Sequence, residues 1–196
     1  ASDLIKKNIK GIILSGGPSS VYAKNAPQID LDILKLHIPI LGICYGMQLL
    51  VKNSDGRVSS RGRGEYGFAE IDKVGNSILL KNISNPSKVW MSHGDEIDDL
   101  GSKYKIIAKS SNGIISAIEH KQKLNFGVQF HPEVIHTDQG KDIIANFLFK
   151  ISNCNPIWTA ANFISESISK INDITGDDGE VITGISGGVD SSVVGT

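Results

Sequence analysis

The chain has 196 residues, of which 40% are hydrophobic and 21% are charged, and its formal net charge is −1. This is the composition of a globular protein that is long enough for one complete α/β domain and part of a second. The near-neutral charge excludes a broad electrostatic surface for nucleic acid or for an anionic membrane, so we expect neither as a partner.

The first quarter of the chain alternates apolar runs with an amphipathic segment. Residues 11–14 predict a strand that ends in the glycine turn at 15–18, and residues 28–36 predict a helix. Residues 38–43 form a second apolar run, which predicts a buried parallel strand. This order indicates an α/β fold.

Cys44 follows the second strand directly and is flanked by Gly42 and Gly46. Residues 45–52 predict a helix, so Cys44 is expected on a strand-to-helix elbow at the carboxyl edge of the sheet. Glycines on both sides make the strained backbone of such an elbow sterically possible. The amino terminus of the helix favours the thiolate form of the cysteine. The segment therefore predicts a covalent nucleophile.

The middle of the chain changes to short β segments separated by turn residues. We predict strands at residues 67–74, 88–91, 104–110 and 114–120. They indicate antiparallel additions to the parallel strands, and hence a mixed sheet.

A partner for the thiolate follows the next predicted strand, residues 124–130. His131 ends this strand and Glu133 lies two residues later, close enough to orient the imidazole. His93 is the other candidate base. We prefer His131 because of its carboxylate neighbour, and we expect His93 in a loop near a domain contact, beside a solvated turn at residues 95–96.

A helix predicted at residues 141–150 closes the first domain. Its expected buried side chains are Ile143, Ile144, Phe147 and Leu148. Residues 152–156 have the composition of a linker, and we place the domain boundary there, between domains of residues 1–152 and 153–196.

The second domain is expected to open with an amphipathic helix and a strand. Apolar residues at helical spacing predict the helix: Ile157, Ala161, Ile164, Ile168 and Ile171. Residues 180–185 predict a strand that leads into a glycine- and hydroxyl-rich loop. Backbone amides and hydroxyls of such a loop can bind a polyanion, and without the lysine of a Walker A loop a pyrophosphate is the better fit.

Several motifs together resemble the class I, or triad, glutamine amidotransferases. They are residues 42–46 with Gln48, the Ser92-His93-Gly94-Asp95 segment, and Phe130-His131-Pro132-Glu133; residues 15–18 resemble the oxyanion loop of that family. The glycine-rich loop resembles the phosphate loop of amidotransferase-linked ATP pyrophosphatases. Both motifs in this order are similar to the GMP synthetase family, and the likeness covers essentially the whole chain.

The resemblance implies a fold and a set of site residues. The fold would be a three-layer, flavodoxin-like mixed sheet with helices on both faces, followed by the beginning of a second α/β domain of the adenine nucleotide α-hydrolase type. Cys44, His131 and Glu133 would be the catalytic triad. The backbone amides of Gly17 and Tyr45 are the expected oxyanion donors. The expected glutamine-binding residues are Gln48, Ser92 and His93.

The resemblance also implies the reaction partners. ATP would bind at the phosphate loop, formed by Ser186, Gly187, Gly188, Val189, Asp190, Ser191 and Ser192. In the GMP synthetase family ATP, with Mg²⁺, adenylates XMP, and ammonia from glutamine displaces AMP to give GMP and pyrophosphate. Glutamine, ATP and XMP are therefore the expected partners, in a full-length homodimer. We expect no prosthetic group and no metal site in the protein.

Two departures and two rival hypotheses remain. The first strand of the family has no counterpart here and the second domain is cut short, so we expect a fragment of a longer polypeptide. The rivals are the glutaminase component of another triad amidotransferase and a non-catalytic glutamine- or nucleotide-binding regulatory module.

The cysteines and the apolar runs indicate a cellular location. Cys44 and Cys154 are the two cysteines of the chain, and no disulfide is expected between them. The longest apolar runs are far shorter than the ~20 residues that cross a bilayer, and the start does not resemble a signal peptide. We expect a cytoplasmic protein.

Overall fold

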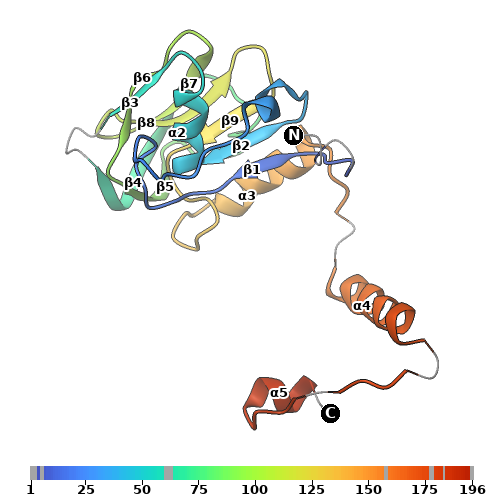
Figure 1. Cartoon of the computed structure of the whole chain (residues 1–196). Helices are drawn as coiled ribbons and strands as arrows, with labels where there is room; N and C mark the ends of the chain where they lie inside the picture. The colour runs from blue at the N-terminus through green and yellow to red at the C-terminus, as the bar shows by residue number, and fades with distance from the viewer. Residues whose placement is uncertain are drawn as a thin grey trace. The chain divides into compact units, whose positions relative to one another are not determined.

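The computed structural model describes residues 4, 7–59, 64–156, 159–176, 179–182 and 184–194. It contains two compact units, Ala1–Cys154 and Asn155–Thr196. Figure 1 shows the β-rich first unit and the helices of the second. The division between the units falls in the segment whose composition is that of a linker.

A seven-stranded mixed sheet forms the framework of the first unit, in the order β1-β2-β9-β8-β7-β4-β5. β1, β2 and β9 are parallel, and the other neighbours in the sheet pair antiparallel. The strands are β1 (Ile12–Leu14), β2 (Ile40–Ile43), β4 (Glu65–Lys73), β5 (Ser87–His93), β7 (Tyr104–Ser110), β8 (Ile115–His120) and β9 (Asn125–Val128). The mixed sheet predicted from the sequence is confirmed.

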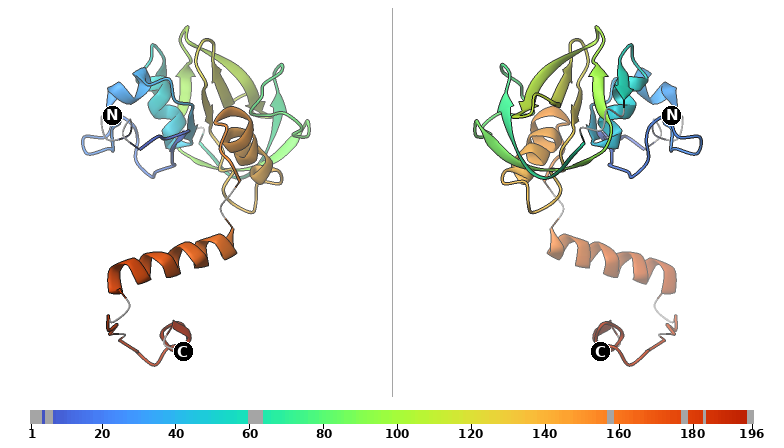
Figure 2. Two further views of the ribbon diagram at one scale, coloured as in Figure 1. Left: turned by 90° about the vertical axis from the view of Figure 1, so that its right-hand side faces the viewer. Right: turned by 90° about the vertical axis from the view of Figure 1, so that its left-hand side faces the viewer.

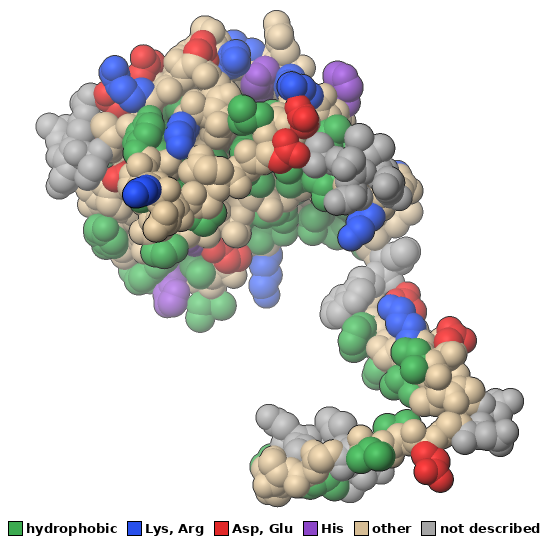
Figure 3. All heavy atoms as spheres, in the orientation of Figure 1, with side chains coloured by type: hydrophobic (Ala, Val, Ile, Leu, Met, Phe, Trp, Pro, Cys, Tyr) green, Lys and Arg blue, Asp and Glu red, His purple; other side chains and the backbone are tan. Residues whose placement is uncertain are grey.

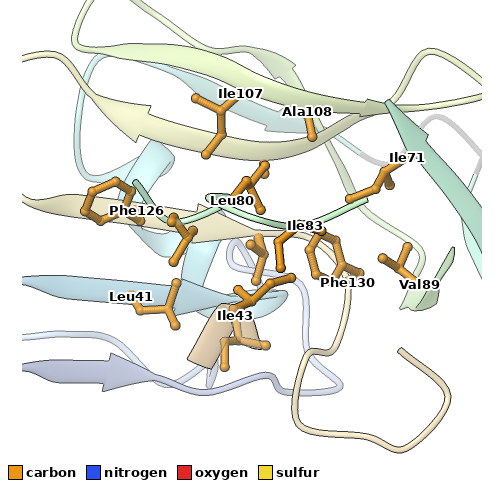
Figure 4. Packing of buried hydrophobic residues seen from close by; sticks show 14 of the residues in the cluster. Leu41, Ile43, Ile71, Leu80, Ile83, Val89, Ile107, Ala108, Phe126 and Phe130 are labelled. Carbon is orange, nitrogen blue, oxygen red and sulfur yellow. The ribbon is translucent and has the colours of Figure 1, made fainter. Parts of the chain in front are cut away.

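Alternation along β2 and β9 divides the core into two clusters on the two faces of the sheet. Leu41 and Ile43 point to one face together with Phe126 and Val128, while Ile40 belongs to the cluster on the other face. Figure 4 shows the first cluster, which the curled antiparallel strands complete with Ile71, Val89 and Ile107 among others. Because both faces are covered, β2 is buried at every residue.

Helices cover both faces, as predicted (Figure 2). α2 (Tyr45–Lys52) lies on one face, where Met47, Leu50 and Val51 pack into the second cluster. Its bounds are those predicted. α3 (Gly140–Ala145) lies on the other face and continues as the π-helix η2 (Asn146–Ile151).

The closing helix differs from the prediction in its last turns, which are wider than an α-helix. Ile143 and Phe147 are fully buried as expected, whereas Ile144 and Leu148 are only partly buried. The amide of Asn146, at the change of helix type, donates to the carbonyls of Leu79 and Lys81 at 3.0 and 2.9 Å. These two bonds tie the helix to the loop beneath it.

Two local predictions for the first unit were wrong. Residues 28–36 form only the short 3₁₀ helix η1 (Leu31–Lys35), because the Asp30 side chain caps its start at the Asp32 amide and Leu36 is already extended ahead of Pro39. Glu96 is not in a turn: it opens β6 (Glu96–Asp99), which pairs with β3 (Arg57–Ser59). Short polar strands of this kind carry no clear alternation, so the sequence did not predict them.

The second unit contains α4 (Ala160–Thr175) and α5 (Val189–Val194). Thr159 caps α4 through a bond from the Asn162 amide at 3.1 Å, and the predicted helix is present, although Ile157 lies outside the described residues. Its apolar side chains are exposed, as Figure 3 shows along this helix: Phe163, Ile164, Ile168, Ile171 and Ile174.

The predicted strand at residues 180–185 does not form among the residues described there, which are 179–182 and 184–185. A strand needs a neighbour for its backbone hydrogen bonds, and the described part of this unit offers none. Thr183 lies outside the described residues.

Candidate active site

Cys44 lies on the predicted elbow between β2 and α2. Its backbone has φ 50° and ψ −105°, which is the left-handed side of backbone space for a residue with a side chain. Such a conformation costs on the order of 1–3 kcal/mol and persists only where the surroundings hold it. Here the Cys44 amide donates to the Val128 carbonyl at 2.7 Å, so the neighbouring strand fixes the elbow.

The flanking glycines are required by packing. A Cβ atom on Gly42 would lie 2.5 Å from the carbonyl carbon of Gly46, and one on Gly46 would lie 2.7 Å from the carbonyl carbon of Leu14. Both distances are shorter than real Cβ contacts. The first turn of α2 can therefore lie against β1 and β2 only if both positions lack side chains.

His131 reaches Cys44 because β9 pairs with β2 in parallel, with Val128 opposite Ile43. The chain then turns, and the His131 amide donates to the carbonyl of Trp90 at 3.0 Å. A Cβ atom on Gly16 would lie 3.0 Å from Cε1 of His131 and 3.6 Å from Cβ of Cys44. Both side chains therefore adjoin the same glycine of the turn after β1.

The charge of His131 depends on two partners. Hydrogen bonding to the Cys44 sulfur is the largest cause that raises the pKa of His131, to about 9, and the bond to Glu133 adds to it, while burial opposes both. Nδ1 of His131 lies 2.7 Å from Oε1 of Glu133, so Nε2 is the nitrogen left to face the sulfur. The three predicted triad members thus come together, with the imidazole protonated at neutral pH.

A hollow of about 320 Å³ opens beside the sulfur, within the range of small-molecule sites. Five of the predicted site residues line it: Gly17, Cys44, Gln48, Ser92 and His93. Tyr66 and Asp95 also contribute to its wall. The hollow therefore joins the predicted nucleophile to the predicted glutamine-binding residues.

Of the two predicted oxyanion donors, Gly17 lines the hollow directly. A Cβ atom on Gly17 would contact the Tyr45 ring at 3.5 Å, so the two residues are neighbours. The Tyr45 side chain points elsewhere and donates its hydroxyl to the Pro27 carbonyl at 2.6 Å. Only the backbone amide of Tyr45, at the start of α2, is a candidate donor.

The glutamine-binding candidates meet at the carbonyl of Asp95. Nε2 of Gln48 lies 3.0 Å from this oxygen, and Nδ1 of His93 lies 2.9 Å from it. His93 is not in an exposed loop, as the sequence suggested, but is the last residue of β5 and 4% exposed. Ser92 contacts the nucleophile through its backbone, because its carbonyl oxygen lies 3.7 Å from the Cys44 sulfur.

Two buried residues that the sequence analysis did not single out belong to the site. Gln129 is fully buried, and its Nε2 donates to the Cys44 sulfur at 3.6 Å. Glu65 is 8% exposed, and its Oε2 lies 3.6 Å from Nε2 of His93. A polar residue at the end of the apolar strand 124–130 was the available sign of Gln129; nothing local distinguishes Glu65.

The predicted phosphate loop lies in the second unit. Gly187 has φ 83°, and α5 starts at Val189. The Ser192 amide and hydroxyl donate to the Gly188 carbonyl at 3.1 and 2.9 Å. The loop-to-helix connection is thus present among the described residues, while its role in binding ATP stays a prediction.

Neither a metal cluster nor a membrane span is found in the part of the chain that the structure describes. No three His, Cys, Asp or Glu side chains there gather closely enough to hold a metal ion. None of the described helices has the length and apolar character to cross a membrane. Both cysteines are free thiols.

Comparison with known families gives one match that covers most of the chain. The model of the class-I glutamine amidotransferases matches residues 1–151. Among curated proteins, the GMP synthase (glutamine-hydrolyzing) of Brachyspira hyodysenteriae is 48% identical over 97% of this chain and 37% of its own length. The enzyme of the same name from Synechocystis is 50% identical over 94% of this chain and 34% of its own length. The chain thus spans about a third of these relatives.

Solved structures give the same fold. A protein of Thermoplasma acidophilum, described as one subunit of a GMP synthase, aligns with a TM-score of 0.66 and 29% identity, over 86% of this chain and 79% of its own. A glutamine amidotransferase of Thermotoga maritima aligns with a TM-score of 0.52 and 19% identity, over 83% of this chain and 72% of its own. At that identity the second likeness concerns the fold alone.

Proposed function

We propose that this chain, which belongs to the class-I glutamine amidotransferase family, hydrolyses the side-chain amide of glutamine at Cys44. The observation that carries the proposal is the meeting of three side chains from distant segments: the sulfur of Cys44, the imidazole of His131 and the carboxylate of Glu133. This is the arrangement that nucleophilic catalysis by a thiol requires.

In the first half of the reaction the Cys44 thiolate attacks the carboxamide carbon of glutamine. A carbon–sulfur bond forms, and the carbonyl oxygen becomes an oxyanion, which the backbone amides of Gly17 and Tyr45 stabilise. His131 then gives its proton to the departing nitrogen, the carbon–nitrogen bond breaks, and ammonia leaves. The pKa of about 9 keeps His131 protonated for this step at neutral pH.

In the second half water hydrolyses the glutamyl thioester. The now neutral His131 removes a proton from the attacking water, and Glu133 stabilises the imidazolium that forms. The carbon–sulfur bond breaks, which returns the thiolate and releases glutamate. Gln48, Ser92 and His93 line the hollow in which the substrate would lie, and we assign them to its binding.

The ammonia is used, on this proposal, to make GMP. Curated relatives that match nearly the whole chain bear the name GMP synthase (glutamine-hydrolyzing). ATP and XMP are then substrates of the complete protein, with Mg²⁺ accompanying ATP, and the loop from Ser186 to Ser192 binds the ATP phosphates. We also propose a homodimer for the complete protein, and the cytoplasm as its location because the nucleophilic thiol must stay reduced.

Two rivals are less well supported. Another triad amidotransferase would not be expected to carry a phosphate loop directly after the glutaminase domain, and the relatives named here match through that loop. A non-catalytic binding module would have no need for a strained cysteine elbow facing a protonated imidazole.

The test replaces the nucleophile. Cys44→Ala is expected to abolish release of ammonia from glutamine, measured by coupled detection of glutamate and ammonia. In the complete protein the same variant should still form GMP from XMP, ATP and added ammonium. Retention of glutamine hydrolysis would refute the assignment of Cys44, and loss of the ammonium-dependent reaction as well would contradict two separate sites.

A further inference from the structure

Gln129 connects the nucleophile to the glutamine-binding residues. It follows β9, is fully buried, and its Nε2 lies 3.6 Å from the Cys44 sulfur. Its Oε1 accepts a hydrogen bond from Nε2 of Gln48 at 3.3 Å. Both ends of the Gln129 amide are therefore engaged inside the protein.

The direction of the Gln129 amide is determined two residues away, at the carbonyl oxygen of Asp95. A carbonyl oxygen can only accept, so the Gln48 group 3.0 Å from it must be the NH₂ group. This NH₂ group has a second hydrogen, which it directs to Gln129, so the Gln129 atom facing it must be the oxygen. The Gln129 NH₂ group is then left to point at the sulfur. A flipped amide at either glutamine would bring two acceptors together.

His93 and Glu65 support the same carbonyl from the other side. Nδ1 of His93 must carry a hydrogen, because it faces the Asp95 oxygen at 2.9 Å. Nε2 of His93 and Oε2 of Glu65 are 3.6 Å apart, and neither has another hydrogen-bond partner in the described part of the chain. Two lone pairs would repel, so a proton lies between these two atoms. Oε1 of Glu65 meanwhile accepts from Ser110 and Asn112 at 2.8 Å each.

The sulfur thus has two opposite neighbours. As a thiol it can donate to the Ser92 carbonyl at 3.7 Å, whereas as a thiolate it can only accept, and Gln129 offers the donor. A hydrogen bond to the charged form favours that form. Gln129 therefore stabilises the thiolate relative to the thiol without carrying a charge of its own.

We propose that Gln129 is a catalytic residue that stabilises the Cys44 thiolate, and that Gln48 is a positioning residue that holds the Gln129 amide in the donating orientation. The inference rests on the proposed function in that Cys44 is taken as the nucleophile. The state of the thiol can be measured without glutamine turnover, however, so the two proposals can fail separately.

The experiment measures alkylation of Cys44 by iodoacetamide as a function of pH, in the absence of glutamine, by mass spectrometry of the peptides. Gln129→Met keeps the length of the side chain and removes the donor. The midpoint for Cys44 is expected to rise by about one pH unit, which is a tenfold slower reaction below the midpoint. Cys154, in the same polypeptide, is the internal reference and should not change.

A second variant tests the orientation. Gln48→Met frees the Gln129 amide to rotate, so we expect a smaller shift in the same direction. The double variant should match Gln129→Met alone, because Gln48 acts through Gln129. Ser116→Ala is the matched control: its fully buried hydroxyl donates to the Ile114 carbonyl instead, and the midpoint should stay at the wild-type value.

Other titratable groups near the sulfur remain in all these variants. They are His131 with Glu133 and, around the hollow, His93, Asp95 and Tyr66. An unchanged Cys44 midpoint in Gln129→Met, with Cys154 labelled as in the wild type, would overturn the inference. If that variant does not fold, an unchanged midpoint in Gln48→Met would overturn it instead. A normal midpoint shift in a protein that does not hydrolyse glutamine would contradict only the proposed function.

Discussion

The position of His131 depends on one hydroxyl group, which makes Thr137 a sharp test of the site. Thr137 is 4% exposed; its hydroxyl accepts from the Trp90 amide at 3.1 Å and donates to the His131 carbonyl at 2.6 Å. The bridge ties the segment that carries the imidazole to β5. Thr137→Val replaces the hydroxyl by a methyl group of similar size and removes both bonds.

The expected magnitude follows from these bonds. An amide left without its acceptor inside a protein costs on the order of 1–3 kcal/mol, so Thr137→Val should lower the free energy of unfolding by about that amount. A catalytic group displaced by about 1 Å can cost on the order of 10² in rate, so glutamine turnover should fall about tenfold to hundredfold. The assays are urea unfolding and steady-state glutaminase kinetics on the same preparations.

Thr137→Ser is the matched control because it keeps the hydroxyl and loses one methyl group, worth about 0.8 kcal/mol. Its turnover should stay within a few-fold of the wild type. The reasoning would be refuted by a Thr137→Val protein with wild-type turnover, or by a Thr137→Ser protein that is equally impaired.

Three further substitutions have definite expected outcomes. Gly46→Ala places a methyl group against the Leu14 carbonyl, so stability should fall by about 1–3 kcal/mol and Cys44 alkylation should slow; unchanged unfolding would show that α2 can move away. Glu133→Gln removes one cause of the raised pKa of His131, so the alkaline limb of kcat/KM, expected near pH 9 where the imidazolium loses its proton, should move to lower pH; a limb that stays in place would exclude this role. Phe147→Ala should cost about 3–5 kcal/mol in urea unfolding, and a loss below 1 kcal/mol would contradict its place in the core.

The sequence predicted the elements that bury apolar runs. The bounds of α2 were predicted because its buried residues begin directly after the elbow glycine pair and end before a polar turn. β7 was likewise predicted at both ends. By contrast β3 and β6 pair only with each other and contain mostly polar residues, so their formation depends on a partner that no local pattern reveals.

The site divides in the same way. Cys44 and His131 could be identified because each directly follows an apolar strand with unusual neighbours. Glu65 could not, because its role arises from a contact with His93 across the β4–β5 pair, where the two residues lie opposite each other. Gln129 carried a weak sign only, a polar residue at the end of an apolar strand. Burial of polar groups by long-range pairing is not encoded in a local period.

The parallel pairing of β2 with β9 has a consequence for how this protein can change over time. The sulfur and the imidazole are held by backbone pairing between neighbouring strands, so the length of the excursion between them does not enter their separation. Turns such as those at Gly75 and Gly113, where a side chain would meet open space, should tolerate inserted residues. One residue inserted within β9 would instead rotate every later side chain to the opposite face and carry His131 away from the sulfur.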